Sequence, residues 1–148
     1  KNIGSNHVLI LGEENFLIMI WKIIYIIWPP ILRILESLHF HYVRQDFLLG
    51  TLNQKYTSTD LKDFLLNKGF SPAILAWKDP GEIFSLRLID QKIFQYHIRL
   101  FNDGEIRGHY EYSSEGNPFN HSFNVGSRDD KKYFHLLLGD YLVINTLR

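Results

Sequence analysis

The sequence predicts an α+β fold, in which a small antiparallel β-meander is flanked by helices. The first observation is a set of three to four runs over about 84–125 in which apolar and polar residues alternate. The second is a pair of segments with helical spacing and capping residues, at about 59–68 and 128–138. The third is an N-terminal hydrophobic segment whose composition differs from that of the remaining chain.

The segment 59–68 has the clearest helical signals in the chain. Leu61, Phe64 and Leu65 form an apolar stripe at helical spacing. Gly69 occupies the position where a left-handed residue commonly ends a helix, and Phe70 follows as the usual hydrophobic contact. The expected N-cap is one of three consecutive hydroxyl residues, Thr57, Ser58 and Thr59.

Three alternating runs follow a turn at 78–82, and they predict the strands of the meander. The runs span 84–89, 93–101 and 105–112, and residues 121–125 are a candidate for a fourth strand. A final helix is expected over 128–138, with Ser127 as its N-cap and with Asp129 and Asp130 in its first turn. Its buried side is predicted to comprise Phe134, Leu137 and Leu138.

The turn between the last two strong runs decides which side chains share a face of the sheet. A two-residue turn at Asp103 and Gly104 would give two mixed faces, which makes a poor sheet. A three-residue turn that also includes Asn102, with Gly104 in the left-handed conformation, separates the faces cleanly. The predicted apolar pairs are then Leu100 with Ile106, Ile98 with Gly108, and Tyr96 with Tyr110. The predicted polar pairs are Arg99 with Arg107, and His97 with His109.

This polar face is the candidate binding site, since arginines directly opposite each other on a sheet repel unless something neutralises them. One interpretation is structural, with nearby Gln95, Glu105 and Glu111 neutralising the face, or with a helix and an acidic residue covering it. The other is a site for an anionic ligand or single-stranded nucleic acid, because arginine binds phosphate and carboxylate bidentately and aromatic side chains stack on bases. The predicted binding residues are Arg87, His97, Arg99, Phe101, Arg107 and His109.

Residues 1–36 are expected to be a hydrophobic N-terminal segment, and residues 37–148 the α+β domain. Residues 16–28 contain one charge, and twenty residues over 16–35 have the length of a membrane span if they form one helix. Membrane anchor, buried core element, cleaved signal sequence and self-association surface are the competing interpretations. Pro29-Pro30 is the expected internal boundary and favours a helix over 31–37, while 38–49 reads equally well as helix or strand.

Composition narrows the classes of function without naming one. The 148 residues carry a formal net charge of zero, so no overall charge draws the chain to nucleic acid or anionic lipid. The absence of cysteine excludes disulfides and thiolate metal sites. It fits a cytoplasmic protein, whether or not residues 16–35 attach that protein to a membrane. No cofactor motif occurs. The chain begins at Lys1 and its single methionine is Met19, so either an initiator has been removed or the sequence is a fragment.

Histidines supply the alternative to a binding or accessory module without enzymatic activity. On a strand, His39 and His41 would point the same way, and His97, His109 or Asp46 would be needed as a third metal ligand. The alternative function is therefore a metal-dependent hydrolase or nuclease. No metal ligand is assigned from the sequence.

Overall fold

The computed structural model describes residues 5–38, 46–117, 121 and 129–144. Contacts within the chain divide it into two compact units, Lys1–Phe40 and His41–Arg148, which are described separately. The architecture is α+β with an open antiparallel sheet, as the sequence predicts.

The described residues of the first unit form one helix, α1 (Ser5–Ser37), which continues through Pro29 and Pro30. Residues 31–37 are helical, as expected, but the helix begins at Ser5, so the expectation that the two prolines open it is wrong. The predicted division of the chain near these prolines stays a prediction. A proline inside a helix removes its own backbone hydrogen bond and crowds the carbonyl four residues earlier, but the hydrogen bonds on either side can still propagate the helix. In the part of the chain that the structure describes, no helix is both long and apolar enough to cross a membrane.

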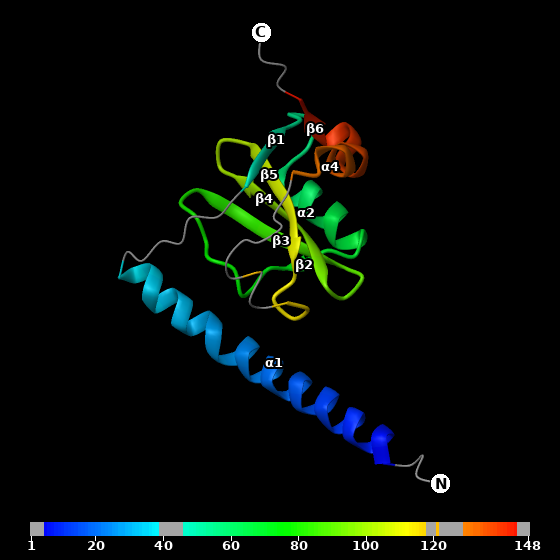
Figure 1. Cartoon of the computed structure of the whole chain (residues 1–148). Helices are drawn as coiled ribbons and strands as arrows, with labels where there is room; N and C mark the ends of the chain where they lie inside the picture. Colours follow the sequence, from blue (N-terminus) through cyan, green and yellow to red (C-terminus); the bar gives the residue numbers. More distant parts are fainter. Residues whose placement is uncertain (1–4, 39–45, 118–120, 122–128, 145–148) are drawn as a thin grey trace. The chain divides into compact units, whose positions relative to one another are not determined.

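The second unit is built on a six-stranded antiparallel sheet with the strand order β2-β3-β4-β5-β1-β6 (Figure 1). The predicted meander corresponds to three of these strands, so the predicted count of three to four is too small. The two-residue strands β2 and β6 are too short to show a periodicity, and β1 lies partly in the ambiguous segment 38–49. The strands are β1 (Phe47–Leu52), β2 (Ser71–Pro72), β3 (Glu82–Asp90), β4 (Phe94–Phe101), β5 (Glu105–Tyr112) and β6 (Leu142–Val143).

The hairpin β4–β5 has the register that the three-residue turn predicts. Ile98 lies opposite Gly108, and His97 lies opposite His109. Gly104 has a φ of 85°, which an L side chain rarely adopts, and its N–H donates to the Phe101 carbonyl over 3.0 Å. The separation of apolar and polar faces, rather than the shortest possible turn, therefore determines the register.

The helix α2 (Ser58–Asn67) begins and ends as its sequence indicates. Thr57 is the N-cap, and a reciprocal pair of hydrogen bonds with Asp60 forms a capping box. At the other end, the Gly69 N–H donates to the Leu66 carbonyl and the Phe70 N–H donates to the Leu65 carbonyl. These two bonds form a Schellman motif, which satisfies carbonyls that the helix end would otherwise leave unpaired.

The last helix, α4 (Lys131–Leu138), starts later than the predicted 128–138. Its N-cap is Asp130, whose side chain accepts a hydrogen bond from the Tyr133 N–H, so the expected cap at Ser127 is wrong. An aspartate carboxylate caps as well as a serine hydroxyl and also interacts favourably with the helix dipole.

A short 3₁₀ turn, η1 (Gly139–Tyr141), leads into β6. Apart from His121, the fourth strand expected over 121–125 lies outside the described residues.

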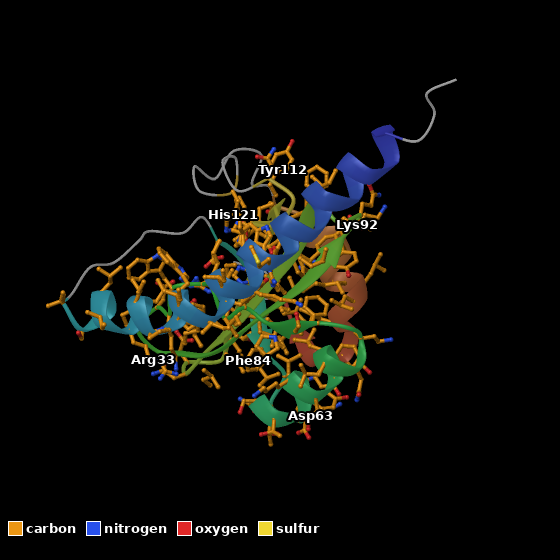
Figure 2. All side chains as sticks on the ribbon, turned by 90° about the horizontal axis from the view of Figure 1, so that it is seen from below. Arg33, Asp63, Phe84, Lys92, Tyr112 and His121 are labelled. Atoms are coloured by element: carbon orange, nitrogen blue, oxygen red, sulfur yellow. The ribbon has the colours of Figure 1, made fainter. Side chains whose placement is uncertain are left out.

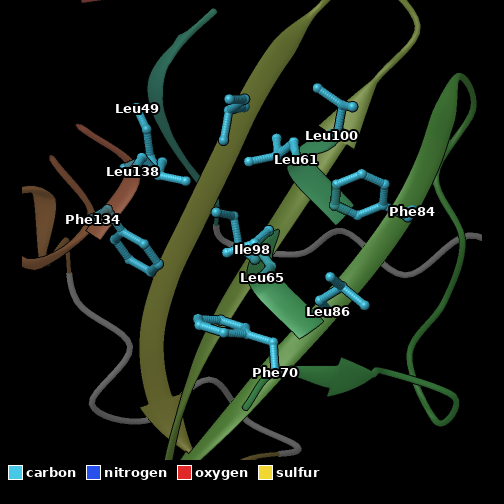
Figure 3. Close-up of a cluster of buried hydrophobic side chains, with 11 residues drawn as sticks. Leu49, Leu61, Leu65, Phe70, Phe84, Leu86, Ile98, Leu100, Phe134 and Leu138 are labelled. Carbon is cyan, nitrogen blue, oxygen red and sulfur yellow. The ribbon is translucent and has the colours of Figure 1, made fainter. Parts of the chain in front are cut away.

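The hydrophobic core lies between one face of the sheet and the two helices α2 and α4, which share that side (Figure 1). Gly108 brings α4 close, because a Cβ at this position would lie 3.0 Å from the Phe134 ring and 2.8 Å from the His97 carbonyl. Side chains from both helices and from the strands interdigitate in this layer (Figure 3). The core comprises Leu49, Leu61, Leu65, Phe70, Phe84, Leu86, Ile98, Leu100, Ile106, Phe134 and Leu138.

Candidate functional site

The opposite face of the sheet carries a band of polar side chains, here called the polar face. Strand pairing produces it, because Arg87 lies opposite His97, which in turn lies opposite His109. A parallel row contains Ser85, Arg99 and Arg107. The structure thus brings all the predicted binding residues to one face. They are Arg87, His97, Arg99, Phe101, Arg107 and His109.

Arg99 is the centre of this face and is completely buried. It forms ion pairs with Asp46 over 2.8 Å and with Glu82 over 3.3 Å. It also donates a hydrogen bond to Asp79, which lies in the turn before β3. A buried cation requires such partners, since moving an isolated charge out of water is prohibitively costly. Arg99 therefore contacts three carboxylates rather than solvent.

Arg107 differs from Arg99 in its exposure. Its side chain is 40% exposed and pairs with Glu105 over 2.5 Å. The hydrogen bond from Arg107 to Glu105 raises the pKa of the arginine. The guanidinium of Arg107 also lies 4.6 Å from the centre of the Phe101 ring, while that of Arg99 lies 5.0 Å from it. Phe101 is itself buried, so its contacts are with arginines of the same chain.

Arg87 completes the set of arginines at the edge of the polar face. Two of its nitrogens donate to the two carboxylate oxygens of Glu115, over 2.6 and 2.9 Å. The pair is bidentate, the geometry in which guanidinium and carboxylate interact most strongly. Each arginine that the sequence assigns to the site therefore contacts at least one carboxylate.

His109 is buried between two carboxylates. Its Nδ1 lies 2.7 Å from Asp46 Oδ1, and its Nε2 lies 3.2 Å from Glu111 Oε1. Burial alone lowers the pKa of His109, but its hydrogen bonds to Asp46 and Glu111 outweigh burial and raise the pKa to about 9. Both ring nitrogens therefore have an anionic neighbour.

Glu111 is also buried and has several donors around it. Burial raises the pKa of Glu111, but the hydrogen bond and the charge of His109 lower it by a larger amount, so the net shift is downward. Gln95 Nε2 donates to Glu111 Oε1 over 2.6 Å. His121 approaches the same oxygen to 3.5 Å, and its Nδ1 is 2.9 Å from the Tyr112 carbonyl. His121 and Tyr112 are both labelled among the side chains in Figure 2.

His97 brings a second imidazole to this group. Its Nε2 lies 2.9 Å from Ser85 Oγ, and its ring meets that of His109 edge-on with centroids 5.2 Å apart. One potential ligand atom from each of His97, His109 and Glu111 lies within 4.8 Å of the other two. These three buried residues are called the His–Glu centre below.

The sequence interpretation did not identify which acidic residues from outside the predicted strands pair with the arginines, and it considered Asp46 only as a metal ligand. Asp46 precedes β1, where Phe47 pairs with Gly108 and Leu48 with Arg107, so continuing the register places Asp46 beside His109. Recognising β1 as the neighbour of β5 would have found this residue. Asp79 lies in a turn and Glu82 at a strand end, and no local pattern indicates which cation they approach. His39 and His41 lie outside the described residues.

The fold and the polar face define an α+β protein with an open antiparallel sheet, one side of which is an apolar core and the other a network of buried charges. Comparison with known protein families, with curated proteins and with solved structures finds no match. Any functional inference for this chain therefore depends on its own site.

Proposed function

We propose that this chain is a metal-binding module that holds one divalent transition-metal ion at the His–Glu centre. The observation that carries the proposal is the convergence of two imidazoles and one carboxylate, with ligand atoms within 4.8 Å of one another. All three side chains are buried, so they are positioned by the sheet and not by solvent. Their spacing follows from strand pairing, since His97 lies opposite His109 and Glu111 is two residues further along β5.

Distances support this assignment. Two nitrogen or oxygen ligands at about 2.1 Å from a tetrahedral ion are roughly 3.4 Å apart. The separation of 3.2 Å between His109 Nε2 and Glu111 Oε1 is compatible with that value. Since no ligand-atom separation exceeds 4.8 Å, the third ligand needs to move by about 1.5 Å at most to complete the set.

The donor set also indicates the class of metal. Imidazole nitrogen is a good ligand for Zn²⁺, Co²⁺ and Fe²⁺, whereas Mg²⁺ and Ca²⁺ prefer sites made wholly of oxygen. The ion would occupy the position of the proton that His109 shares with Glu111. Among the ion pairs that the structure describes, Arg99 and His109 share four carboxylates between them, which favours an additional positive charge. These carboxylates belong to Asp46, Asp79, Glu82 and Glu111.

Calorimetric titration of the chelator-treated full chain with Zn²⁺ and Co²⁺ tests the proposal, with Mg²⁺ as the hard-cation comparison. We expect one Zn²⁺ per chain, and binding at least about 100-fold weaker in His97→Gln, because one ligand contributes about 3 kcal/mol of a typical structural zinc site. Glu111→Gln should behave likewise. His135→Gln is the matched control, because His135 lies on α4 outside the centre.

Two results would overturn the metal proposal. One is a wild-type chain that binds neither Zn²⁺ nor Co²⁺. The other is binding that survives unchanged in both His97→Gln and Glu111→Gln, which would place the ion on other histidines. Circular dichroism of each variant shows whether the fold is retained, so that lost binding is not confused with unfolding.

Binding of an anionic ligand or nucleic acid to the polar face stays a prediction and ranks second. The predicted residues share one face, as that function requires, but a ligand anion must displace a carboxylate already bound to each arginine. Exchange is easiest at Arg107, because its pair with Glu105 is partly exposed and such pairs contribute little. Salt-dependent binding of short single-stranded RNA that is lost in Arg107→Met would support this function.

Metal-dependent hydrolysis is a further step that binding alone does not establish. A tetrahedral ion with three protein ligands keeps a fourth position for water, as catalytic zinc sites do. The hydrolase hypothesis requires turnover that depends on the metal and disappears in His97→Gln. Binding without turnover would leave the chain as a metal-binding module.

A further inference from the structure

A chain of three buried side chains connects the centre of the polar face to the His–Glu centre. Arg99 contacts Asp46 Oδ2 over 2.8 Å, and Asp46 Oδ1 lies 2.7 Å from His109 Nδ1. Each oxygen of Asp46 thus has its own cationic or hydrogen-bonding neighbour. The side chain of Asp46 is only 6% exposed and that of Arg99 is 0% exposed, so water does not compete appreciably for these contacts.

Arg99 is itself held in place on its other sides. Asp79 and Glu82 contact the same guanidinium from the turn before β3 and from the start of that strand. A rotation of Arg99 away from Asp46 would leave buried charges unpaired, which is strongly unfavourable. The orientation of the Asp46 carboxylate is therefore determined by Arg99 before any ion is bound.

The contact between Asp46 and Nδ1 leaves Nε2 as the nitrogen of His109 that faces Glu111. A histidine that binds a metal through one nitrogen usually donates the other N–H to a carboxylate, which fixes the ring and strengthens it as a ligand. Asp46, just before β1, provides that carboxylate. The two ligands next to it, His109 and Glu111, both lie on β5. Besides the proposed ligands, the arrangement thus includes a carboxylate, that of Asp46, which contacts a ligand and not the ion itself.

We infer that Asp46 is a positioning residue of the His–Glu centre, which holds His109 by its Nδ1–H so that Nε2 binds the ion. The inference depends on the proposed metal-binding function. It goes further by assigning the nitrogen that ligates and the residue that orients it. Arg99 acts one step further out, by orienting the carboxylate of Asp46.

The test compares Asp46→Asn with Asp79→Asn in the full chain by Zn²⁺ titration. Each variant removes one carboxylate charge that pairs with Arg99, but only Asp46 also contacts His109. We expect Asp46→Asn to weaken Zn²⁺ binding about 10- to 100-fold with one ion still bound per chain. Asp79→Asn should weaken binding clearly less than Asp46→Asn does, because Asp79 reaches His109 only through Arg99 and Asp46.

A spectroscopic measurement separates positioning from general stabilisation. In the Zn²⁺-loaded wild type, ¹⁵N-resolved NMR should show a protected Nδ1–H on His109, and this signal should shift or disappear in Asp46→Asn. If Asp46→Asn does not fold, Asp46→Glu keeps the charge but moves the acceptor oxygens by one methylene. That variant should also bind Zn²⁺ more weakly than wild type.

The outcomes distinguish the two inferences. A wild type that binds no ion overturns the metal-binding function and the positioning role together. Wild-type binding with an unchanged affinity in Asp46→Asn, or with equal losses in Asp46→Asn and Asp79→Asn, overturns only the positioning role. Ligation of His109 through Nδ1 in the NMR spectrum would overturn it as well.

Discussion

At the scale of single residues, the most informative position is the buried Arg99. An arginine on a sheet face is usually taken as exposed and ready to bind a ligand, but this one is fully buried among carboxylates. Its role in the structure is to neutralise Asp46 and Glu82, whose side chains are 6% and 4% exposed. The same charge on Arg107, which is partly exposed, contributes much less to the free energy of unfolding.

Replacing Arg99 with methionine tests this difference between two arginines of one face. Removing one member of a buried ion network leaves the others uncompensated, so we expect Arg99→Met to lower the free energy of unfolding by about 3–5 kcal/mol. Arg107→Met, the matched control, should lower it by less than about 1 kcal/mol. Urea denaturation of both variants measures the difference. Equal losses would show that burial of Arg99 does not set its contribution.

At the scale of secondary structure, α2 is the element whose ends are most completely specified by local sequence. Its N-terminus has the capping box of Thr57 and Asp60, and its C-terminus has the Schellman motif at Gly69 and Phe70. The core-facing residues Leu61 and Leu65 lie between these two signals and are fully buried. Local hydrogen bonding and core packing therefore agree on the same helix.

The capping box makes a prediction about mutation. Thr57→Ala removes the side chain that accepts the Asp60 N–H over 3.1 Å. We expect it to lower the free energy of unfolding by about 1 kcal/mol, the usual cost of losing a helix cap. Thr59→Ala is the control, because Thr59 lies beside the cap without occupying it. Thermal unfolding of both variants gives the comparison, and an equal effect of the two substitutions would contradict a specific cap.

The same box has a defined pH dependence. The backbone hydrogen bond from Thr57, followed by the hydroxyl hydrogen bond, lowers the pKa of Asp60 from its ordinary value of 3.8. A lowered folded-state pKa means that the stabilisation is present above pH 3.8 and is lost as the pH falls through the folded-state value. Asp60→Asn should therefore be less stable than wild type near neutral pH, and the difference should shrink in acid. A difference that is independent of pH would exclude the charge of Asp60 as its origin.

At the scale of the whole molecule, the division into Lys1–Phe40 and His41–Arg148 is the main feature. Within the second unit, the described core cluster draws its members from β1, α2, β3, β4, β5 and α4 together with Phe70. The expectation that a hydrophobic N-terminal segment precedes an independent α+β domain stays a prediction, as does anchoring of that segment in a membrane. Its exposed apolar residues include Ile23, Ile26 and Ile34.

A fragment of residues 41–148 tests the independence of the second unit. Since all the residues of the described core cluster belong to this unit, we expect the fragment to unfold cooperatively in urea. Leu86→Ala within the fragment should lower the free energy of unfolding by about 2–5 kcal/mol, as expected for a fully packed core residue. A fragment without a cooperative transition, or one insensitive to Leu86→Ala, would show that residues 1–40 are needed for folding.

Local sequence by itself determined the elements whose signals are contained within a few consecutive residues. The capped helix α2, the strands β3 to β5 and the register of the β4–β5 hairpin belong to this class, because periodicity, caps and one turn specify them. The clustering of His97, Arg99, Arg107 and His109 on one face follows from that register alone. The two-residue strands and the continuation of α1 through Pro29 and Pro30 did not follow, because neither has a sufficient local signal.

Only the tertiary structure decided the chemical character of the polar face. From the sequence, its arginines predict a basic surface, because Asp46, Asp79 and Glu115 lie far along the chain from the residues they neutralise. Strand β1 brings Asp46 to His109, and turns bring Asp79 to Arg99 and Glu115 to Arg87. The physical reason is that a strand pattern specifies which way a side chain points, whereas the charge it meets depends on chain segments that fold back from a distance.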